Sequence, residues 1–303
     1  MSKIVALVGS TASGKSDIAL KAAKEHGAEI LSCDSLLVYR GLNIGTAKPS
    51  NEELALVKHH GVDIVDLTYP YTAGDYVRCM RPILDRLIKE NKHALIIGGT
   101  GFYLKGLVCG VWDAPPTHLE IREQLEKEAN NELYARLLAV DPEYAQKIKA
   151  GDRYRVIRAL EIIEVTGEPV SCALAKKQLL NPLPYPISIF GIKRTKMDLE
   201  RRIVERTNFM FQKGLVAETK ALLAQYSTPP RPFFCVGYNE VTRFLSGQMT
   251  LPECRERIVI STRQLAKKQM TFFKTFPSPI LWHNLPSEEE ELFRVIRATF
   301  NSS

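Results

Sequence analysis

The segment from Gly9 to Ser16 has the residue types and the spacing of a phosphate-binding loop. It matches the pattern G-x-x-x-x-G-K-[ST] at every fixed position. Glycines let backbone N–H groups wrap around phosphate oxygens, the lysine adds a positive charge, and the last hydroxyl is suited to Mg²⁺. We therefore expect a site for a diphosphate or polyphosphate, with Mg²⁺ as cofactor and Ser16 as its ligand. The residues of this loop are Gly9, Ser10, Thr11, Ala12, Ser13, Gly14, Lys15 and Ser16.

This loop by itself leaves the transferred group open. A nucleotide hydrolase with such a loop normally has another strand that ends in an aspartate for the metal. Residues 62–66 could supply it, whereas the run at 95–100 ends in glycines and a hydroxyl instead of a carboxylate. A kinase that uses ATP is therefore an alternative. A P-loop protein that binds RNA without catalysis is another.

Asp34 is the next residue whose position could do chemistry. It follows the strand-like run at 29–33, and ligands of open α/β sheets collect beyond the carboxyl ends of the strands. A carboxylate there could act as a general base toward a nucleophile near the diphosphate. A helix N-cap and an outer-sphere contact to Mg²⁺ are alternatives that position and spacing leave open.

Alternating strands and helices must position these groups. Residues 3–8, 29–33, 62–67 and 93–97 are strand-like, and helices are predicted at 17–26 and 76–90. This alternation is typical of an α/β fold, a P-loop NTPase-like doubly wound parallel sheet. The carboxyl ends of its strands share one edge, so the sheet places Lys15 and Asp34 on the same side.

The alternation of predicted strands and helices ends after residue 114. Helices are predicted at 119–139, from 142 onward and at 153–165, and strand character returns only at 187–192. Further helices are predicted at 198–213, 217–226, 238–246 and 251–276. We therefore divide the chain into a P-loop core with C-terminal helices, residues 1–114 plus 187–303, and a helical insertion domain, residues 115–186.

Composition and charge limit the classes of partner. The chain has 303 residues, is 45% hydrophobic and carries a net charge of +7. No apolar run approaches the roughly 20 residues that cross a bilayer, and no secretory signal is recognised, so we expect a cytoplasmic monomer without a membrane partner. Basic residues cluster at 147–158 and 255–274. Either cluster alone fits a solvated helix face, but two clusters beside a phosphate site favour a nucleic-acid partner.

Several further segments resemble motifs of the tRNA dimethylallyltransferases (tRNA isopentenyltransferases) of the bacterial type. They lie at 34–49, 98–104, 152–161, 236–238 and 262–269, in the order of the family, so the resemblance covers nearly the whole chain. The segment at 34–49 is the most specific. The chain departs from the pattern at Leu36-Leu37, where Met-Gln or Ala-Gln is commoner, at Ser10, where proline is usual, and at Phe272, which is often tryptophan.

The resemblance implies a reaction. A dimethylallyl group would move from dimethylallyl diphosphate to N6 of adenosine-37, next to the anticodon in tRNA, with release of diphosphate. Asp34 would take the proton from N6, and Thr11 would lie at the reaction centre. Arg206 would join the P-loop in holding the diphosphate.

The resemblance also implies a tRNA-binding side. The target adenine must be extruded from the anticodon loop, at a cost of a few kcal/mol. Phe272 and Phe273 offer stacking surfaces beside lysines, although at least one of them is expected in the core. The residues implied to contact the tRNA anticodon stem-loop are Asp34, Ser35, Leu36, Leu37, Thr100, Arg122, Tyr154, Arg155, Val156, Ile157, Arg158, Val236, Gly237, Tyr238, Lys267, Lys268, Gln269, Phe272 and Lys274.

Overall fold

The computed structural model describes residues 3–176, 179–180 and 182–302. The chain divides into two compact units, and the larger combines Met1–Cys109 with Leu183–Ser303. The smaller unit is Gly110–Pro182. Each unit has its own apolar core.

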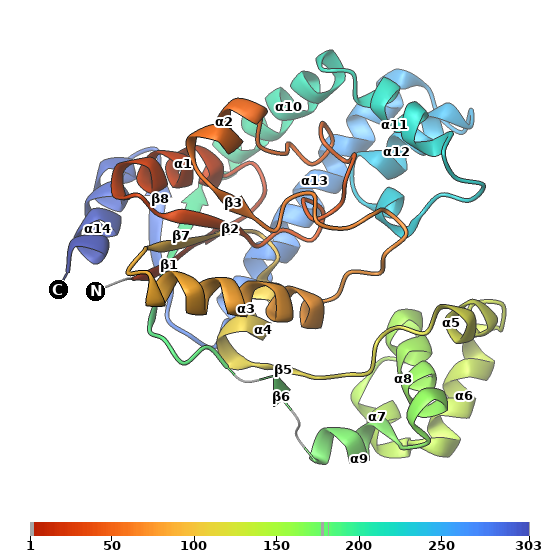
Figure 1. Ribbon diagram of the computed structural model, residues 1–303. Coiled ribbons are helices and arrows are strands. Elements are labelled where there is room, and N and C mark those ends of the chain that lie inside the picture. The colour runs from red at the N-terminus through yellow and green to blue at the C-terminus, as the bar shows by residue number, and fades with distance from the viewer. Residues whose placement is uncertain (1–2, 177–178, 181, 303) are drawn as a thin grey trace. The chain divides into compact units, whose positions relative to one another are not determined.

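The larger unit is built on a parallel six-stranded sheet with the strand order β3-β2-β4-β1-β7-β8 (Figure 1). Strand β1 (Ile4–Gly9) lies at its centre, between β4 (Ala94–Gly98) and β7 (Ile187–Arg194). The outer strands are β2 (Glu29–Ser32), β3 (His59–His60) and β8 (Leu281–Leu285). Both faces of a parallel sheet are covered, which explains the unbroken apolar runs in β1 and β4.

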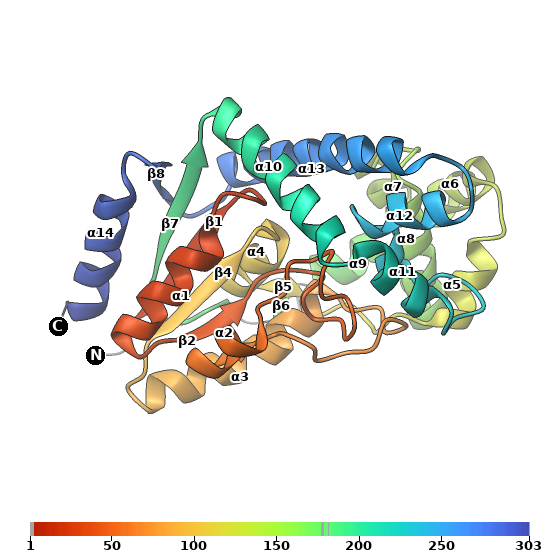
Figure 2. The same ribbon diagram turned by 90° about the horizontal axis from the view of Figure 1, so that it is seen from above.

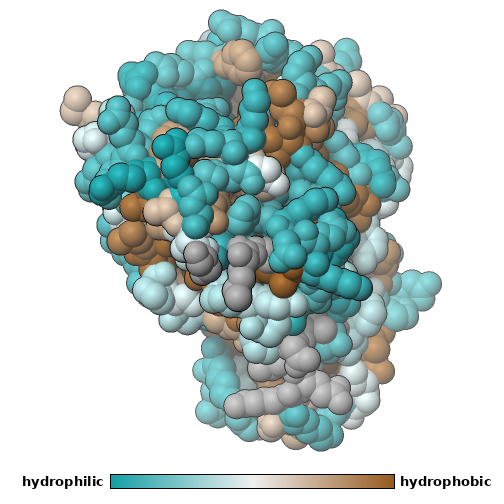
Figure 3. Space-filling view, turned by 60° about the vertical axis from the view of Figure 1, so that its left-hand side comes forward, coloured by the Kyte–Doolittle hydropathy of each residue, from teal (hydrophilic) through white to brown (hydrophobic). Residues whose placement is uncertain are grey.

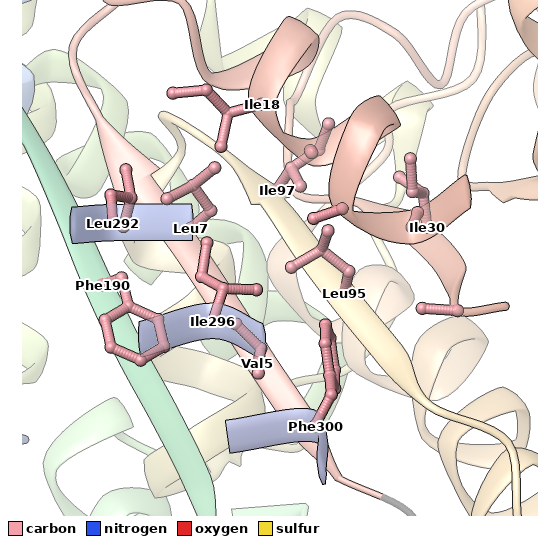
Figure 4. Close-up of a cluster of buried hydrophobic side chains, with 14 of the residues drawn as sticks. Val5, Leu7, Ile18, Ile30, Leu95, Ile97, Phe190, Leu292, Ile296 and Phe300 are labelled. Atoms are coloured by element: carbon pink, nitrogen blue, oxygen red, sulfur yellow. The ribbon is translucent and has the colours of Figure 1, made fainter. Parts of the chain in front are cut away.

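Helices cover both faces of this sheet. Helices α1 (Lys15–His26) and α14 (Glu289–Asn301) pack together on one face, where Leu7, Phe190 and Phe300 belong to one buried cluster (Figure 4). Helices α3 (Ala73–Lys89) and α4 (Gly101–Cys109) lie on the other face (Figure 1). The expected doubly wound α/β fold is confirmed.

Four further helices of the larger unit form a second layer around a separate core. They are α10 (Lys196–Gln212), α11 (Leu215–Leu223), α12 (Tyr238–Leu245) and α13 (Leu251–Lys274), with a short 3₁₀ turn at Arg231–Phe234 (Figure 2). Their core includes Val38, Tyr39 and Leu42 from the segment after Asp34. The C-terminal helices therefore pack directly against the loop that follows β2.

The smaller unit is helical apart from one antiparallel pair, β5 (Val111–Trp112) with β6 (Leu179–Leu180). Its helices are α5 (Leu119–Leu125), α6 (Asn130–Val140), α7 (Pro142–Lys147), α8 (Arg153–Thr166) and α9 (Val170–Ala175). They surround a core that contains Leu133, Leu137 and Leu160. The helix predicted at 119–139 is therefore two helices, broken between Leu125 and Asn130.

One predicted strand is wrong. Residues 62–67 form a loop, and their one bridge joins Val65 to Tyr39, which also lies outside the described strands of the sheet. Asp63 has a positive φ of 53°, which a regular strand does not allow. The edge strand is instead β3, and α2 (Asn51–Leu56), which the sequence analysis missed, begins with a capping box formed by Ser50 and Glu53.

The face of the molecule shown in Figure 3 is mostly hydrophilic, with apolar side chains scattered over it. Throughout the described residues, no helix combines the length and the apolar character needed to span a bilayer.

Candidate active site

The P-loop lies at the carboxyl end of the central strand. Gly9 ends β1 with a φ of 152°, and Gly14 precedes α1 with a φ of 91°. Only glycine adopts such angles without strain, so the loop needs a glycine at both positions. Lys15 and Ser16 then form the first turn of α1, where the free N–H groups and the helix dipole favour an anion.

Two arginines that were not predicted bind backbone carbonyls of this loop. Arg194 Nε donates a hydrogen bond of 2.7 Å to the carbonyl of Ser13, and Arg202 Nε donates one of 2.8 Å to the carbonyl of Ala12. The C=O and N–H of a trans peptide point in opposite directions. The N–H of Gly14 therefore points away from Arg194, which holds the carbonyl of the same peptide.

A sequence pattern could have indicated only one of these two arginines as a site residue. Arg202 precedes Arg206 by four positions in a predicted helix, a spacing that places both on one face. Arg194, at the end of β7, had no such signal.

Lys15 is the cation at the centre of the loop. Its Nζ donates hydrogen bonds to the carbonyl of Ser10, at 2.6 Å, and to Ser13 Oγ, at 3.4 Å. Burial lowers the pKa of Lys15 to about 8, while the Asp34 carboxylate acts in the opposite direction and Arg206 lowers the pKa further. An anion bound in the loop would favour the protonated lysine.

Asp34 follows strand β2, which is separated from β1 by β4, and it lines the same cleft. Its Oδ1 accepts a hydrogen bond of 2.9 Å from the N–H of Leu36. Residues 35–38 form a turn instead of a helix, so the N-cap alternative for Asp34 does not apply. Asp34 lines one cleft with Lys15 and Arg206, and its charge opposes the lowering of their pKa values by burial.

The end of β4 holds the turn that carries Asp34. A Cβ on Gly98 would lie 1.9 Å from the carbonyl oxygen of Cys33, so the two strand ends approach each other only because residue 98 is a glycine. Thr100 N donates to the carbonyl of Cys33 at 3.1 Å, and Thr100 Oγ1 accepts from Ser35 N at 3.1 Å. Thr100 thus fixes the backbone on both sides of Asp34.

A cleft of about 1470 Å³ in the larger unit is lined by Lys15, Asp34 and Arg206. Arg206, on α10, donates a hydrogen bond of 3.2 Å to the carbonyl of Thr46, and burial lowers its pKa, an effect that the Asp34 carboxylate opposes. The lining residues on which the chemistry depends are Thr11, Ala12, Gly14, Lys15, Ser16, Asp34, Leu37, Arg202, Arg206 and Gln269. Among the described residues, no group of three or more His, Cys, Asp or Glu side chains could hold a metal ion.

The residues of the larger unit that were predicted to contact tRNA differ in their exposure to solvent. Tyr238 is fully buried, so its side chain cannot contact RNA, and that prediction is wrong; Gly237 is also buried. Val236 is half-buried. Lys267, Lys268 and Lys274 are exposed on α13.

The two neighbouring phenylalanines of α13 differ. Phe273 is buried, as was expected of at least one of them. Phe272 is half-buried, and a Cβ on Gly101 would lie 2.3 Å from its ring.

In the smaller unit, the predicted residues separate by helix periodicity. Val156 and Ile157 are in the core, so their side chains pack against helices and are not available to RNA, which corrects that prediction. Tyr154 and Arg155 are exposed on the opposite face of α8. The Arg122 guanidinium lies 5.4 Å from the centre of the Tyr154 ring.

A fully buried carboxylate, Glu161, organises the arginines of this unit. It forms ion pairs with Arg158, at 3.0 Å, and with Arg122, at 3.2 Å, and it accepts a hydrogen bond of 2.6 Å from the N–H of His118. Sequence analysis noted Glu161 only as part of a motif. A buried carboxylate needs such partners.

Comparison with known proteins agrees with this geometry. The IPP transferase family matches residues 37–276. The chain is 41% identical to tRNA dimethylallyltransferase 1 of Citrifermentans bemidjiense, over 94% of this chain and 92% of that protein. It is 39% identical to tRNA dimethylallyltransferase of Geobacter sulfurreducens, over 98% and 97%. The crystal structure of tRNA isopentenylpyrophosphate transferase from Bacillus halodurans aligns with a TM-score of 0.70 and 29% identity, over 99% of this chain and 97% of that one.

Proposed function

The chain belongs to the IPP transferase family, which includes the tRNA dimethylallyltransferases, and we propose on this premise that it transfers a dimethylallyl group from dimethylallyl diphosphate to N6 of adenosine-37 in tRNA. Diphosphate is the other product. The observation that carries this proposal is that Lys15, Arg206 and Asp34 line one cleft. Two cations suit a leaving diphosphate, and a carboxylate beside them suits the proton that the attacking amine loses.

The cations act on the leaving group. As the bond between the allylic carbon and oxygen breaks, negative charge builds on the diphosphate. Lys15, Arg206 and the N–H groups at the start of α1 would stabilise this charge, in a cleft where partial burial strengthens electrostatic interactions. Arg202 lines the same cleft and adds a third cation.

Asp34 acts on the acceptor. The N6 nitrogen forms the new bond to carbon and loses a proton, which the Asp34 carboxylate would accept. One of its oxygens already accepts the N–H of Leu36, so the other would take the proton. Thr11, at the start of the P-loop, would lie beside the reacting carbon.

Mg²⁺ fits this site as an ion shared with the substrate. Ser16 places an exposed hydroxyl at the start of α1, whereas no group of three acidic, cysteine or histidine side chains occurs among the described residues to bind a metal by itself. Mg²⁺ usually keeps several waters and binds substrate phosphates together with one or two protein groups. When bound, it would neutralise part of the charge on the diphosphate.

The tRNA anticodon stem-loop is the proposed partner of the exposed cations. Lys267, Lys268 and Lys274 would contact its backbone, with Tyr154 and Arg155 of the smaller unit as further contacts. The target base would be extruded to reach Asp34. We propose that the protein acts as a monomer in the cytoplasm.

A transfer assay tests the function directly. Labelled dimethylallyl diphosphate is incubated with the protein, Mg²⁺ and an anticodon stem-loop with adenosine at position 37, and label should appear in the RNA. A stem-loop with guanosine at that position is the control and should stay unlabelled. Transfer of phosphate from ATP, with no transfer of label from the prenyl donor, would instead support the kinase alternative.

A further inference from the structure

The carboxylate of Glu218 contacts a loop that is distant from it in sequence. Glu218 is on α11, and it accepts hydrogen bonds from the backbone N–H groups of Asn43 at 3.3 Å, Ile44 at 3.0 Å and Gly45 at 3.4 Å. Consecutive N–H groups that converge on one carboxylate form charge-assisted hydrogen bonds, which are stronger than neutral ones. Glu218 therefore determines the path of this loop.

Tyr238 completes the arrangement. Its hydroxyl donates a hydrogen bond of 2.5 Å to Glu218 and accepts one of 3.1 Å from the N–H of Gly45. A Cβ on Gly45 would lie 2.5 Å from the Tyr238 ring, so the contact requires glycine at this position. Burial, together with the hydrogen bond to Glu218, raises the pKa of Tyr238, which keeps its hydroxyl protonated.

The loop held in this way forms one wall of the cleft. Ile44, Thr46 and Lys48 line the cleft together with residues of the P-loop. The carbonyl of Thr46 accepts the hydrogen bond from Arg206, and among the described residues this is the only hydrogen bond that the Arg206 guanidinium makes. A shift of the loop would therefore move the acceptor that orients Arg206.

We propose that Glu218 and Tyr238 are positioning residues that hold the Asn43–Thr46 loop so that Arg206 faces the leaving diphosphate. Neither side chain needs to touch substrate. Tyr238, which the sequence motif had suggested as an RNA contact, acts here through Glu218 and Gly45. This inference rests on the proposed function, in particular on the contact between Arg206 and the diphosphate.

A double-mutant cycle separates positioning from general stabilisation. Glu218→Gln keeps the shape of the side chain but loses its charge, and it should lower kcat/KM for dimethylallyl diphosphate about 10- to 100-fold at saturating RNA. In an Arg206→Ala background, Glu218→Gln should lower kcat/KM less than about threefold, because the side chain that Glu218 positions is absent. Equal fold-losses in the two backgrounds would overturn the proposal.

Two further measurements keep the test decisive. Tyr238→Phe removes only the hydroxyl. It should lower kcat/KM less than Glu218→Gln does, with the same dependence on Arg206, and it replaces Glu218→Gln in the test if that variant does not fold. Binding of inorganic pyrophosphate should weaken in both variants, while the affinity for the stem-loop stays the same. A loss of stem-loop affinity alone would instead return Tyr238 to the RNA side and contradict the inference.

The controls distinguish failure of this inference from failure of the function. Glu290→Gln is the same substitution at an exposed position of α14, and it should leave kcat/KM unchanged. If the unmodified protein transfers no label, the proposed function fails. If it transfers label but the variants lose activity independently of Arg206, only the positioning role fails.

Discussion

The backbone N–H of Thr11 donates a hydrogen bond of 2.8 Å to Oε1 of Gln269, 258 positions later in the chain. Gln269 is on α13, the helix that also carries the exposed Lys267 and Lys268. A Cβ on Gly99 would lie 2.2 Å from Nε2 of the same glutamine. One side chain therefore joins the P-loop, the end of β4 and the helix proposed to contact RNA.

Replacement of Asp34 should abolish turnover without loss of RNA binding. In Asp34→Asn the proton acceptor is gone while the size is kept, so we expect kcat to fall about 10²- to 10⁴-fold, with the stem-loop Kd within about twofold. Asp66→Asn is the matched control, since Asp66 pairs with Arg40 in an exposed loop. A wild-type kcat for Asp34→Asn would mean that another group takes the proton.

The titration of Lys15 should make kcat/KM for dimethylallyl diphosphate dependent on pH. Its pKa of about 8 means that the free protein loses this charge as the pH rises through that value. Since the charged form binds the diphosphate, kcat/KM for the donor should be highest below about pH 8 and fall about tenfold per unit well above it. Lys15→Gln should lower kcat/KM and remove this limb of the profile. A limb that persists in Lys15→Gln would assign it to another group.

Arg202 should matter for donor affinity. Arg202→Ala loses the hydrogen bond to the carbonyl of Ala12 and a cation of the cleft, so the KM for dimethylallyl diphosphate should rise about tenfold, as expected for one charge-assisted contact of about 1.5 kcal/mol. Arg201→Ala, which removes an exposed neighbour, should have little effect. Equal KM values for the two variants would show that Arg202 is not a ligand of the diphosphate.

Glu161 should matter for the stability of the smaller unit. In Glu161→Gln, the guanidiniums of Arg122 and Arg158 lose their buried partner, which typically costs about 3–5 kcal/mol. Thermal unfolding followed by circular dichroism should show a lower transition for the variant. Glu132→Gln, at an exposed position of α6, is the control. Unchanged unfolding in Glu161→Gln would contradict this role.

Prediction from sequence succeeded where the determinant is local. The P-loop depends on glycine angles, an adjacent lysine and the first turn of a helix, all within the segment from Gly9 to Ser16, and apolar runs predicted its parallel sheet. Prediction failed at residues 62–67, where an apolar alternation lies in a loop instead of a strand. There Asp63 has a positive φ and pairs with the buried side chain of Lys48, a distant partner that the alternation does not reveal.

The amino-acid sequence by itself determined the P-loop at Gly9 to Ser16, the position of Asp34 after a strand, the fold class and the family. The tertiary structure alone decided which motif residues face the cleft and which support it. Tyr238, Val156 and Ile157 belong to motif segments but are buried, while Arg194, Arg202 and Glu218 hold the loops of the cleft without a motif of their own. The physical reason is that their partners are distant in sequence, and neither periodicity nor spacing encodes which distant surfaces meet.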